Sequence, residues 1–333
     1  MKKSSRSSIL VVLLIPFIIL GIVLWWFVNL QPVNPSNKEK IYLVVSKGDS
    51  LAEISGQLAN QGLIRDQFHF KILVFLMGIS KKMQAGGYYL NPSMDERQIA
   101  VNLTKGTNDR WVTIVEGLRN EQIGEFLIKQ GFAINPDEWM VMITSDNLEG
   151  KLFPDSYLFP KGATQAAILK IFNRNFQKKV VEGLGDELSR SSFNLEEVLT
   201  LASMVEREAN HNVGRTTIAG ILIKRLQNGW PLQVDATVQY AVASQKCSIF
   251  KSPCDWWSDK LSPADLQIKS KYNTYLNRGL PPGPICSPGL ASIKAVLQPK
   301  DSPYWYYLSD KNGVMHYAKT SSEHQANIQK YLK

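Results

Sequence analysis

The sequence predicts an α+β protein that one N-terminal helix attaches to a membrane. Three observations predict this architecture. Residues 9–28 form an apolar run of 20 positions without a charge. Short strand and helix patterns alternate between residues 41 and 105, and helical periodicity dominates from residue 165 to a strand hairpin near the C-terminus. With 333 residues and 44% hydrophobic content, the chain is long enough for about two domains.

The apolar run matches the ~20 residues that a helix needs to cross the hydrocarbon core of a bilayer. Basic residues precede it, as they precede the apolar region of a secretory signal peptide. That region usually has only ~7–15 residues and ends in a cleavage site with small residues. Here the run is longer and carries Trp25 and Trp26 where an interfacial aromatic belt would lie. We therefore expect the helix to stay attached to the protein.

The charge distribution predicts the orientation of this span. Lys2, Lys3 and Arg6 keep residues 1–8 in the cytoplasm, and the chain beyond the transmembrane helix at 9–29 lies outside. Residues 30–40 contain two prolines with polar and charged neighbours, which is typical of an extended linker. The predicted location is therefore the inner (cytoplasmic) membrane, crossed once, with the larger part of the chain periplasmic or extracytoplasmic.

Residues 41–107 are predicted to form a small α+β module. Ser50 or Asp49 is placed to cap its first helix, and Gly106 is placed to end its last one. Such a module either binds a ligand or acts as a spacer that holds the next domain away from the membrane. Its expected elements are a strand at 41–47, a helix from about 51 to 63, a helix at 66–78, a strand at 87–90 and a helix at 94–105.

Residues 108–333 are predicted to form a larger, mixed α+β domain. Two prolines bracket the aromatic segment 151–160, so we expect a fixed loop there and no central strand. The Asn312-Gly313 pair predicts a hairpin turn. The other expected elements are a strand at 111–115, helices at 119–130, 165–184, 194–209, 213–228 and 234–244, hairpin strands at 304–308 and 314–318, and a helix that begins near Ser321 or Ser322.

Charge and cysteine content narrow the possible partners. The formal net charge is +9, of which three units belong to the N-terminal basic residues. A moderately basic exported part suits an anionic surface, although solubility alone explains it equally well. No run of basic residues alternates with aromatics, so nucleic acid is not an expected partner. Cys247 and Cys254 could close a short loop and leave Cys286 free, but spacing alone leaves this open.

Several common chemistries lack their motifs. The chain has no G-x-S-x-G, Walker, G-x-G-x-x-G or H-E-x-x-H pattern, so serine esterases, nucleotide-binding enzymes and the common metalloproteases lose their main support. It has no C-x-x-C pair, and His211, His316 and His324 are far apart in sequence. We therefore predict no metal site.

The stretch LASMVEREAN at 201–210 contains the most informative residue. In a helix capped by Asn194, with Glu197 in the capping-box position, Glu206 falls on the centre line of the apolar stripe. A carboxyl group there either meets a partner, such as a buried arginine, or is desolvated so that it can serve as a general acid. The alternative is that the helix extends past the core at its C-terminal end and leaves Glu206 in solvent. Glu208 points to the opposite side and is expected to be an ordinary solvated charge.

Two other segments are candidates for binding. Asp235 precedes a helical pattern, where capping is its simplest explanation and a functional role the alternative. The loop at 272–289 combines tyrosines, asparagines and four prolines. Aromatic rings and amides held by prolines suit a carbohydrate groove, although a rigid structural loop has the same composition.

Taken in order, these motifs resemble the endolytic murein transglycosylases of the MltG (YceG-like) family. The resemblance covers residues 41–333. The matching stretches are LFPDSY at 152–157, LASMVERE at 201–208, LQVDATV at 232–238, YNTY at 272–275, GLPPGPI at 279–285, HY at 316–317 and EH at 323–324.

This resemblance implies a LysM-like module at 41–107 and a catalytic transglycosylase domain at 108–333. It implies cleavage of the MurNAc–GlcNAc β-1,4 bond in nascent glycan strands, with a 1,6-anhydro-MurNAc end, and Glu206 as the single general acid/base. The sugar's own C6 hydroxyl attacks C1, so no metal or cofactor is needed. Substrate-binding roles follow for Asp235, Thr237, Tyr272, Asn273 and Tyr275. Peptidoglycan is the implied substrate, and peptidoglycan synthases and division or elongation proteins are candidate partners.

Two departures from the family pattern are visible. Ala236 stands where the family usually has proline, which makes a role for Asp235 less certain. Residues 244–260, with two cysteines and two tryptophans, have no counterpart in the pattern and could alter substrate access or contact a partner. Two other functions remain open: a non-catalytic glycan-binding scaffold, and a hydrolytic muramidase that would need a second carboxylate within ~10 Å of Glu206.

Overall fold

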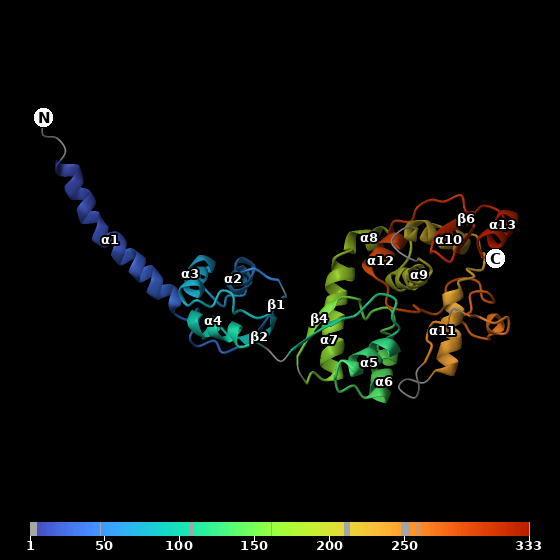
Figure 1. Ribbon diagram of the computed structural model, residues 1–333, viewed down its shortest axis with the longest axis horizontal. Coiled ribbons are helices and arrows are strands. Elements are labelled where there is room, and N and C mark those ends of the chain that lie inside the picture. Colours follow the sequence, from blue (N-terminus) through green and yellow to red (C-terminus); the bar gives the residue numbers. More distant parts are fainter. Residues whose placement is uncertain are drawn as a thin grey trace. The chain divides into compact units, whose positions relative to one another are not determined.

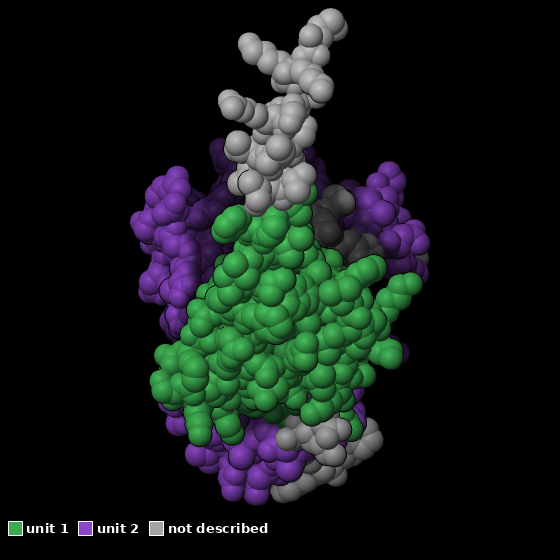
Figure 2. Space-filling model, turned by 90° about the vertical axis from the view of Figure 1, so that its left-hand side faces the viewer, with its two compact units in different colours: residues 1–111, 158–161 green, residues 112–157, 162–333 purple. Residues whose placement is uncertain are grey.

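The computed structural model describes residues 5–46, 48–106, 109–160, 162–209, 214–247, 254–258 and 260–332, with side chains from residue 15 onward. The chain divides into two compact units, coloured separately in Figure 2. Unit 1 comprises residues 1–111 with 158–161, and unit 2 comprises 112–157 with 162–333. The described part combines helices with three two-stranded sheets, which confirms the predicted α+β class (Figure 1).

The first helix, α1, extends over Ser5–Leu30. From Ile15 to Leu24 its described side chains are exposed, whereas Asn29 and Leu30 are buried against the rest of unit 1. Among the described residues, no helix is both long and apolar enough to cross a membrane. The predicted transmembrane helix at 9–29 lies partly outside that set, because side chains up to residue 14 are not described, and it stays a prediction.

The remainder of unit 1 is a β-α-α-β arrangement followed by one more helix. Strand β1 pairs antiparallel with β2, from Ile41 opposite Leu90 to Val45 opposite Gly86. Ser50 caps α2 with a complete capping box, as predicted. The elements are β1 (Ile41–Val45), α2 (Leu51–Asn60), α3 (Gln67–Leu76), β2 (Gly86–Leu90) and α4 (Glu96–Thr104).

A buried polar pair joins α3 to α4. His69 Nδ1 lies 2.7 Å from Glu96 Oε2, and both side chains are almost completely buried. Burial, with a smaller contribution from the charge of Asp66, raises the pKa of Glu96 to about 8. Burial also lowers the pKa of His69. At neutral pH the two groups therefore form a hydrogen bond between uncharged partners, which avoids the cost of two buried charges.

The chain from residue 110 onward is mainly helical. The segment 151–160, predicted to be a fixed loop, contains the strand β4. Its two prolines flank β4 and do not interrupt it. Among the described strands, β4 pairs only with β3. Helices α6, α8 and α12 were not predicted. The elements are β3 (Arg110–Thr113), α5 (Asn120–Lys129), α6 (Pro136–Ser145), β4 (Ser156–Phe159), α7 (Gln165–Phe176), a π-helical turn (Gln177–Glu182), α8 (Gly185–Arg190), α9 (Leu195–Glu208), α10 (Arg215–Gln227), α11 (Asp235–Lys246), a 3-10 turn (Asp265–Gln267), α12 (Leu290–Leu297), β5 (Tyr306–Ser309), β6 (Met315–Ala318) and α13 (Ser321–Tyr331).

Helix α9 is the centre of unit 2. Its residues from Val198 to Val205 are all buried, and it packs against α10, α11 and α12. Asn194 caps it, and Glu197 completes the predicted capping box. The cap fixes the start of α9, and the packing of α10, α11 and α12 against the helix positions the side chains of its last turn.

Candidate active site

The last turn of α9 places two glutamates in different surroundings. Glu206 and Glu208 are two residues apart, so their side chains leave the helix about 200° apart. Neither is freely solvated: both are only partly exposed to solvent. The chemistry of each depends on the elements that it meets.

Glu206 is held by an arginine and a backbone amide. Arg215, the first residue of α10, donates from Nη2 to Oε1 at 3.0 Å. Gly289, which precedes α12, donates its N–H to Oε2 at 2.8 Å. The Glu206 side chain is 6% exposed and the Arg215 side chain 10%. The structure thus confirms that Glu206 lies in the apolar stripe and shows that it meets a buried arginine there.

A second carboxyl group, which the sequence did not reveal, lies beside this ion pair. Glu116 Oε2 is 3.9 Å from the same Arg215 Nη2. The Glu116 and Glu206 oxygens are therefore no farther apart than the sum of the two distances to Nη2, about 6.9 Å. Burial raises the pKa of Glu116, the charge of Glu206 raises it further, and Arg215 opposes both. Glu116 is half-exposed, so it can exchange protons with solvent.

Glu208 has the surroundings expected of a general acid. Burial and the nearby charge of Asp235 raise its pKa to about 7. A hydrogen bond from the Tyr307 hydroxyl, the charge of Arg225 and the N–H of Ala236 oppose this shift. The prediction that Glu208 is an ordinary solvated charge is wrong, because β5 and the start of α11 cover its side of α9.

Glu208 lines a cavity of about 540 Å³. The walls come from the end of α9, the start of α11, β5 and one side of α13, and Tyr275 closes one side. Asp235 lies on the same wall and accepts a hydrogen bond of 2.5 Å from the Tyr275 hydroxyl. This volume falls in the range of ~300–1,000 Å³ typical of small-molecule sites. The cavity thus brings together two predicted binding residues and one carboxyl group that is partly protonated near neutral pH.

Two further features of this cavity are unusual. Gln233, on its wall, has a φ of 51°, a left-handed conformation that non-glycine residues seldom adopt. Such strain often occurs at functional sites. Among the described residues, the buried Nδ1 of His324, from α13, has no hydrogen-bond partner, and the ring of His324 stacks on Tyr306. Burial lowers the pKa of His324, so it is uncharged at neutral pH and offers the cavity a polar group without a charge.

The remaining predicted binding residues lie elsewhere. Thr237 is buried, and its Oγ1 donates to the Val234 carbonyl and lies 2.9 Å from Thr274 Oγ1. Asn273 is also buried and donates to two backbone carbonyls of its own loop. The ring of Tyr272 packs against that of Tyr240 at an interplanar angle of 42°, with centroids 4.7 Å apart. The substrate-binding roles of these three residues stay predictions. In the structure, their contacts hold the loop that presents Tyr275.

Asp235 does not cap α11 through its side chain. It is the first residue of the helix, the cap position belongs to Val234, and no side-chain hydrogen bond closes the helix start. The capping interpretation is therefore wrong, and the Asp235 carboxylate is engaged with Tyr275 instead.

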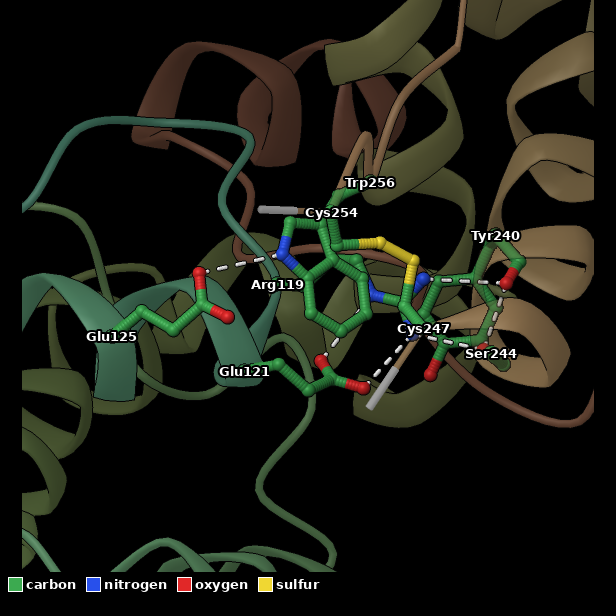
Figure 3. The surroundings of a disulfide bond; sticks show 8 residues. All are labelled: Arg119, Glu121, Glu125, Tyr240, Ser244, Cys247, Cys254 and Trp256. Carbon is green, nitrogen blue, oxygen red and sulfur yellow. Dashed lines mark hydrogen bonds and ion pairs between the residues drawn. A yellow bond between two sulfur atoms is a disulfide. The ribbon is translucent and has the colours of Figure 1, made fainter. Parts of the chain in front are cut away.

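Of the segment without a family counterpart, residues 244–247, 254–258 and 260 are described, and Trp256 contacts α5 and its cap. Cys247 and Cys254 form a disulfide (Figure 3). Cys286 is free and buried. Trp256 Nε1 donates to Glu125 at 3.4 Å, and the Arg119 guanidinium lies over the Trp256 ring at 4.7 Å. The disulfide thus fixes the chain shortly before Trp256, whose ring contacts Arg119 of unit 2.

No group of three His, Cys, Asp or Glu side chains in the described part of the chain is arranged to hold a metal ion. His211 lies outside the described residues.

Sequence reasoning missed Glu116, Arg225 and Tyr307. One signal was present: Glu116 precedes a glycine directly after the predicted strand at 111–115, a position where loops often present side chains. Arg225 and Tyr307 lie within a helical and a strand pattern, and nothing local distinguishes them from ordinary surface residues. Their role depends on contacts across unit 2.

Comparisons with known proteins identify the relatives of this chain. A model of the YceG-like family matches residues 43–330. An endolytic murein transglycosylase of Bacillus subtilis is 32% identical, over 91% of this chain and 88% of that protein. An endolytic murein transglycosylase of Streptococcus pneumoniae is 25% identical, and the match covers 60% of its length. The crystal structure of a YceG-like protein from Listeria monocytogenes is 28% identical and covers 87% of this chain and 99% of that one, with a TM-score of 0.55.

Proposed function

The chain belongs to the YceG-like family, and from this premise we propose that it is an endolytic lytic transglycosylase of peptidoglycan. It cleaves the MurNAc–GlcNAc β-1,4 bond inside nascent glycan strands and leaves a 1,6-anhydro-MurNAc end, which terminates strand elongation. Homologues named endolytic murein transglycosylases support the reaction class. The cavity at the end of α9 supports a site for the glycan.

The observation that carries this proposal is the Glu208 carboxyl group at the wall of a cavity of about 540 Å³. A general acid must hold a proton at the working pH and must reach the bond that it protonates. Its pKa of about 7, raised first by burial and then by Asp235, meets the first requirement. Its place in the cavity beside Asp235 and Tyr275 supports the second. We therefore propose Glu208 as the general acid/base.

The reaction needs only this one carboxyl group. Protonated Glu208 donates its proton to the glycosidic oxygen as the bond to C1 breaks. The C6 hydroxyl of the same MurNAc attacks C1, and the Glu208 carboxylate then accepts the proton of that hydroxyl. The new C6–O–C1 bond closes the anhydro ring, no water is consumed, and Glu208 ends protonated as it began. Intramolecular attack has the proximity advantage over attack by water.

The prediction from resemblance places this role on Glu206 instead. Glu206 is bonded to Arg215 and to the Gly289 amide, which occupy both of its oxygens. Glu208 also accepts hydrogen bonds, from Tyr307 and from the Ala236 amide, so what distinguishes Glu206 is its direct ion pair with Arg215. Glu206 therefore stays the alternative acid/base, and the experiment below separates the two residues directly.

A hydrolytic muramidase is the second candidate function, and two observations favour it. If Glu206 is the acid, Glu116 supplies a second carboxyl group no farther than about 6.9 Å from it, within the ~10 Å that this function needs. The other observation concerns Glu208. Asp235 lies in the same cavity and interacts electrostatically with Glu208, so two carboxyl groups face one site. Inverting glycosidases use such a pair to activate water. Asp235, however, accepts the hydrogen bond of Tyr275 at 2.5 Å, which ties up one of its oxygens. The chemical nature of the product ends distinguishes the two functions.

We also propose that residues 9–29 anchor the enzyme in the inner (cytoplasmic) membrane, with the catalytic unit outside the cytoplasm. The uncharged run and the exposed apolar side chains of α1 support this. The β1-α2-α3-β2 order supports a LysM-like module that binds glycan. Peptidoglycan synthases and division or elongation proteins are the proposed protein partners. The reaction proposed for Glu208 does not depend on any of these proposals.

The test is product analysis. Peptidoglycan digested with the wild-type protein is compared with digests by Glu208→Gln and Glu206→Gln, and the chain ends are identified by mass spectrometry. Anhydro-MurNAc ends that disappear only in Glu208→Gln are the expected result.

A further inference from the structure

Helix α3 of unit 1 is apolar on both of its sides. Its inner side, with Phe70, Leu73 and Val74, belongs to the core of unit 1. Its outer side carries Phe68, Ile72, Phe75 and Leu76 at helical spacing. Phe68, Phe75 and Leu76 are 59%, 73% and 66% exposed, and Ile72 is half-buried. We call these four residues the outer face of α3. A surface helix with a large apolar outer face is a sign of an interaction surface.

The end of α1 is attached to the same helix. The Trp25 and Trp26 rings pack on the ring of His69, with centroids 5.0 and 4.4 Å away. His69 follows Phe68 directly in α3. Figure 1 shows the end of α1 lying against α3 and α4. The outer face therefore begins next to the last turn of the apolar helix.

The exposed apolar side chains of α1 continue to the turn where Trp25 and Trp26 contact His69. Phe27 and Val28, which follow the two tryptophans, are 59% and 56% exposed. Tryptophans at the end of an apolar helix lie at the boundary between hydrocarbon and headgroups. If α1 spans the membrane, a helix that contacts these tryptophans lies at that boundary too.

The charges next to the outer face suit a membrane surface. Lys71 lies within α3, with its ammonium group 5.9 Å from the centre of the Phe68 ring. Lys81 and Lys82 follow the helix and are exposed. Apolar side chains flanked by lysines are typical of helices that lie in the interface plane of anionic bilayers.

We propose that the outer face of α3 lies in the headgroup region of the bilayer that α1 spans, so that unit 1 binds the membrane through two elements. This inference rests on the proposed membrane anchorage and is independent of the chemistry at Glu208. The lipid surface covers the apolar side chains that the fold of unit 1 leaves exposed. A second contact also restricts the rotation of unit 1 about the end of α1.

The test uses the full chain reconstituted in vesicles of phosphatidylcholine and phosphatidylglycerol. A Phe75→Cys variant carries an environment-sensitive fluorophore on the outer face, and an Ala52→Cys variant carries it on the exposed side of α2. The native disulfide and buried Cys286 leave the introduced cysteine as the accessible thiol. Lipids with a spin label near the headgroup serve as quenchers, and iodide serves as the aqueous quencher.

We expect the label at position 75 to be quenched by spin-labelled lipid several-fold more than the label at position 52, and to be protected from iodide. Equal lipid quenching at both positions would overturn the inference. So would protection from iodide without lipid quenching, because a protein would then cover the face. Alkaline extraction of the same vesicles checks the premise: release of the protein would overturn the anchorage, and with it this inference, without touching the proposed reaction.

Discussion

The Glu208 carboxyl group accepts a hydrogen bond from the Tyr307 hydroxyl, and the two residues face one cavity from α9 and β5. The bond opposes the effect of burial on the pKa of Glu208, which nevertheless rises to about 7. Two residues earlier, Glu206 is bonded to Arg215 and Gly289. The end of α9 therefore carries two carboxyl groups with different roles. Glu208 is suited to proton transfer, and Glu206 is suited to holding α9, α10 and the start of α12 together.

The first prediction concerns pH. Glu208 must be protonated to act as an acid, so activity should fall as the pH rises through its pKa of about 7. Tyr307→Phe removes a hydrogen bond that lowers this pKa, so the fall should move to higher pH. Tyr306→Phe, on the same cavity wall, is the matched control and should leave the midpoint in place. The measurement is kcat/KM against pH for the three proteins, and a midpoint that moves down in Tyr307→Phe would contradict the assignment.

The second prediction concerns Glu206. Its replacement by glutamine removes one partner of a buried ion pair and leaves the half-exposed Glu116, 3.9 Å away, as an acidic group beside Arg215 among the described residues. Hydrogen bonds to charged groups contribute about 1.5–3 kcal/mol, so we expect a loss of about 2 kcal/mol in unfolding free energy. Glu196→Gln, in the first turn of α9, breaks a surface ion pair with Lys151 and should cost under about 1 kcal/mol. Calorimetric unfolding of both variants checks this, and equal stability would show that the ion pair has no structural role.

The third prediction concerns the close packing of α10. A methyl group at Gly220 would lie 2.1 Å from the backbone oxygen of Lys300, which cannot move away as a side chain could. Overpacking of this kind typically costs about 1–3 kcal/mol, so Gly220→Ala should lower the unfolding temperature. Gly185→Ala, in α8, meets nothing within 4 Å and should be neutral or stabilising. Thermal unfolding followed by circular dichroism is sufficient, and an unchanged Gly220→Ala would refute the contact.

The fourth prediction concerns the disulfide between Cys247 and Cys254. The chain has 3 cysteines, so protein purified without reductant and then denatured should show one free thiol, that of Cys286, and three after reduction. The paired Cys247→Ser and Cys254→Ser substitutions should lower stability by about 2 kcal/mol, because the bond closes a short loop. Three free thiols before reduction would show that the pair does not form.

Sequence reasoning predicted what local interactions decide. The caps at Ser50 and Asn194 involve residues three positions apart, so the starts of α2 and α9 were visible in the sequence. The burial of Glu206 followed from helical spacing alone. The surroundings of Glu208 did not, because Tyr307 is almost a hundred residues away and reaches α9 only in the folded unit.

The errors have physical reasons as well. Pro154 and Pro160 bracket β4 without entering it, and a strand with a single partner tolerates prolines at its ends. Helix α12 has only eight residues in a proline-rich region, so its periodicity was too short to recognise. It forms because α9 and α10 pack against it. Asp235 was interpreted as a cap because the sequence shows a hydrogen-bond acceptor directly before a helical pattern. The sequence does not show that the partner of this acceptor is Tyr275, 40 residues away.

The most direct test of the central claim is mass spectrometry of the chain ends released from peptidoglycan by the wild type, Glu208→Gln and Glu206→Gln, each shown to be folded by calorimetry. The account predicts anhydro-MurNAc ends from the wild type and from the less stable Glu206→Gln, and none from Glu208→Gln. Anhydro ends from Glu208→Gln with none from folded Glu206→Gln would contradict it and assign the acid to Glu206. Reducing ends from the wild type would replace the transglycosylase with a muramidase, and glycan binding without any cleavage would indicate a scaffold.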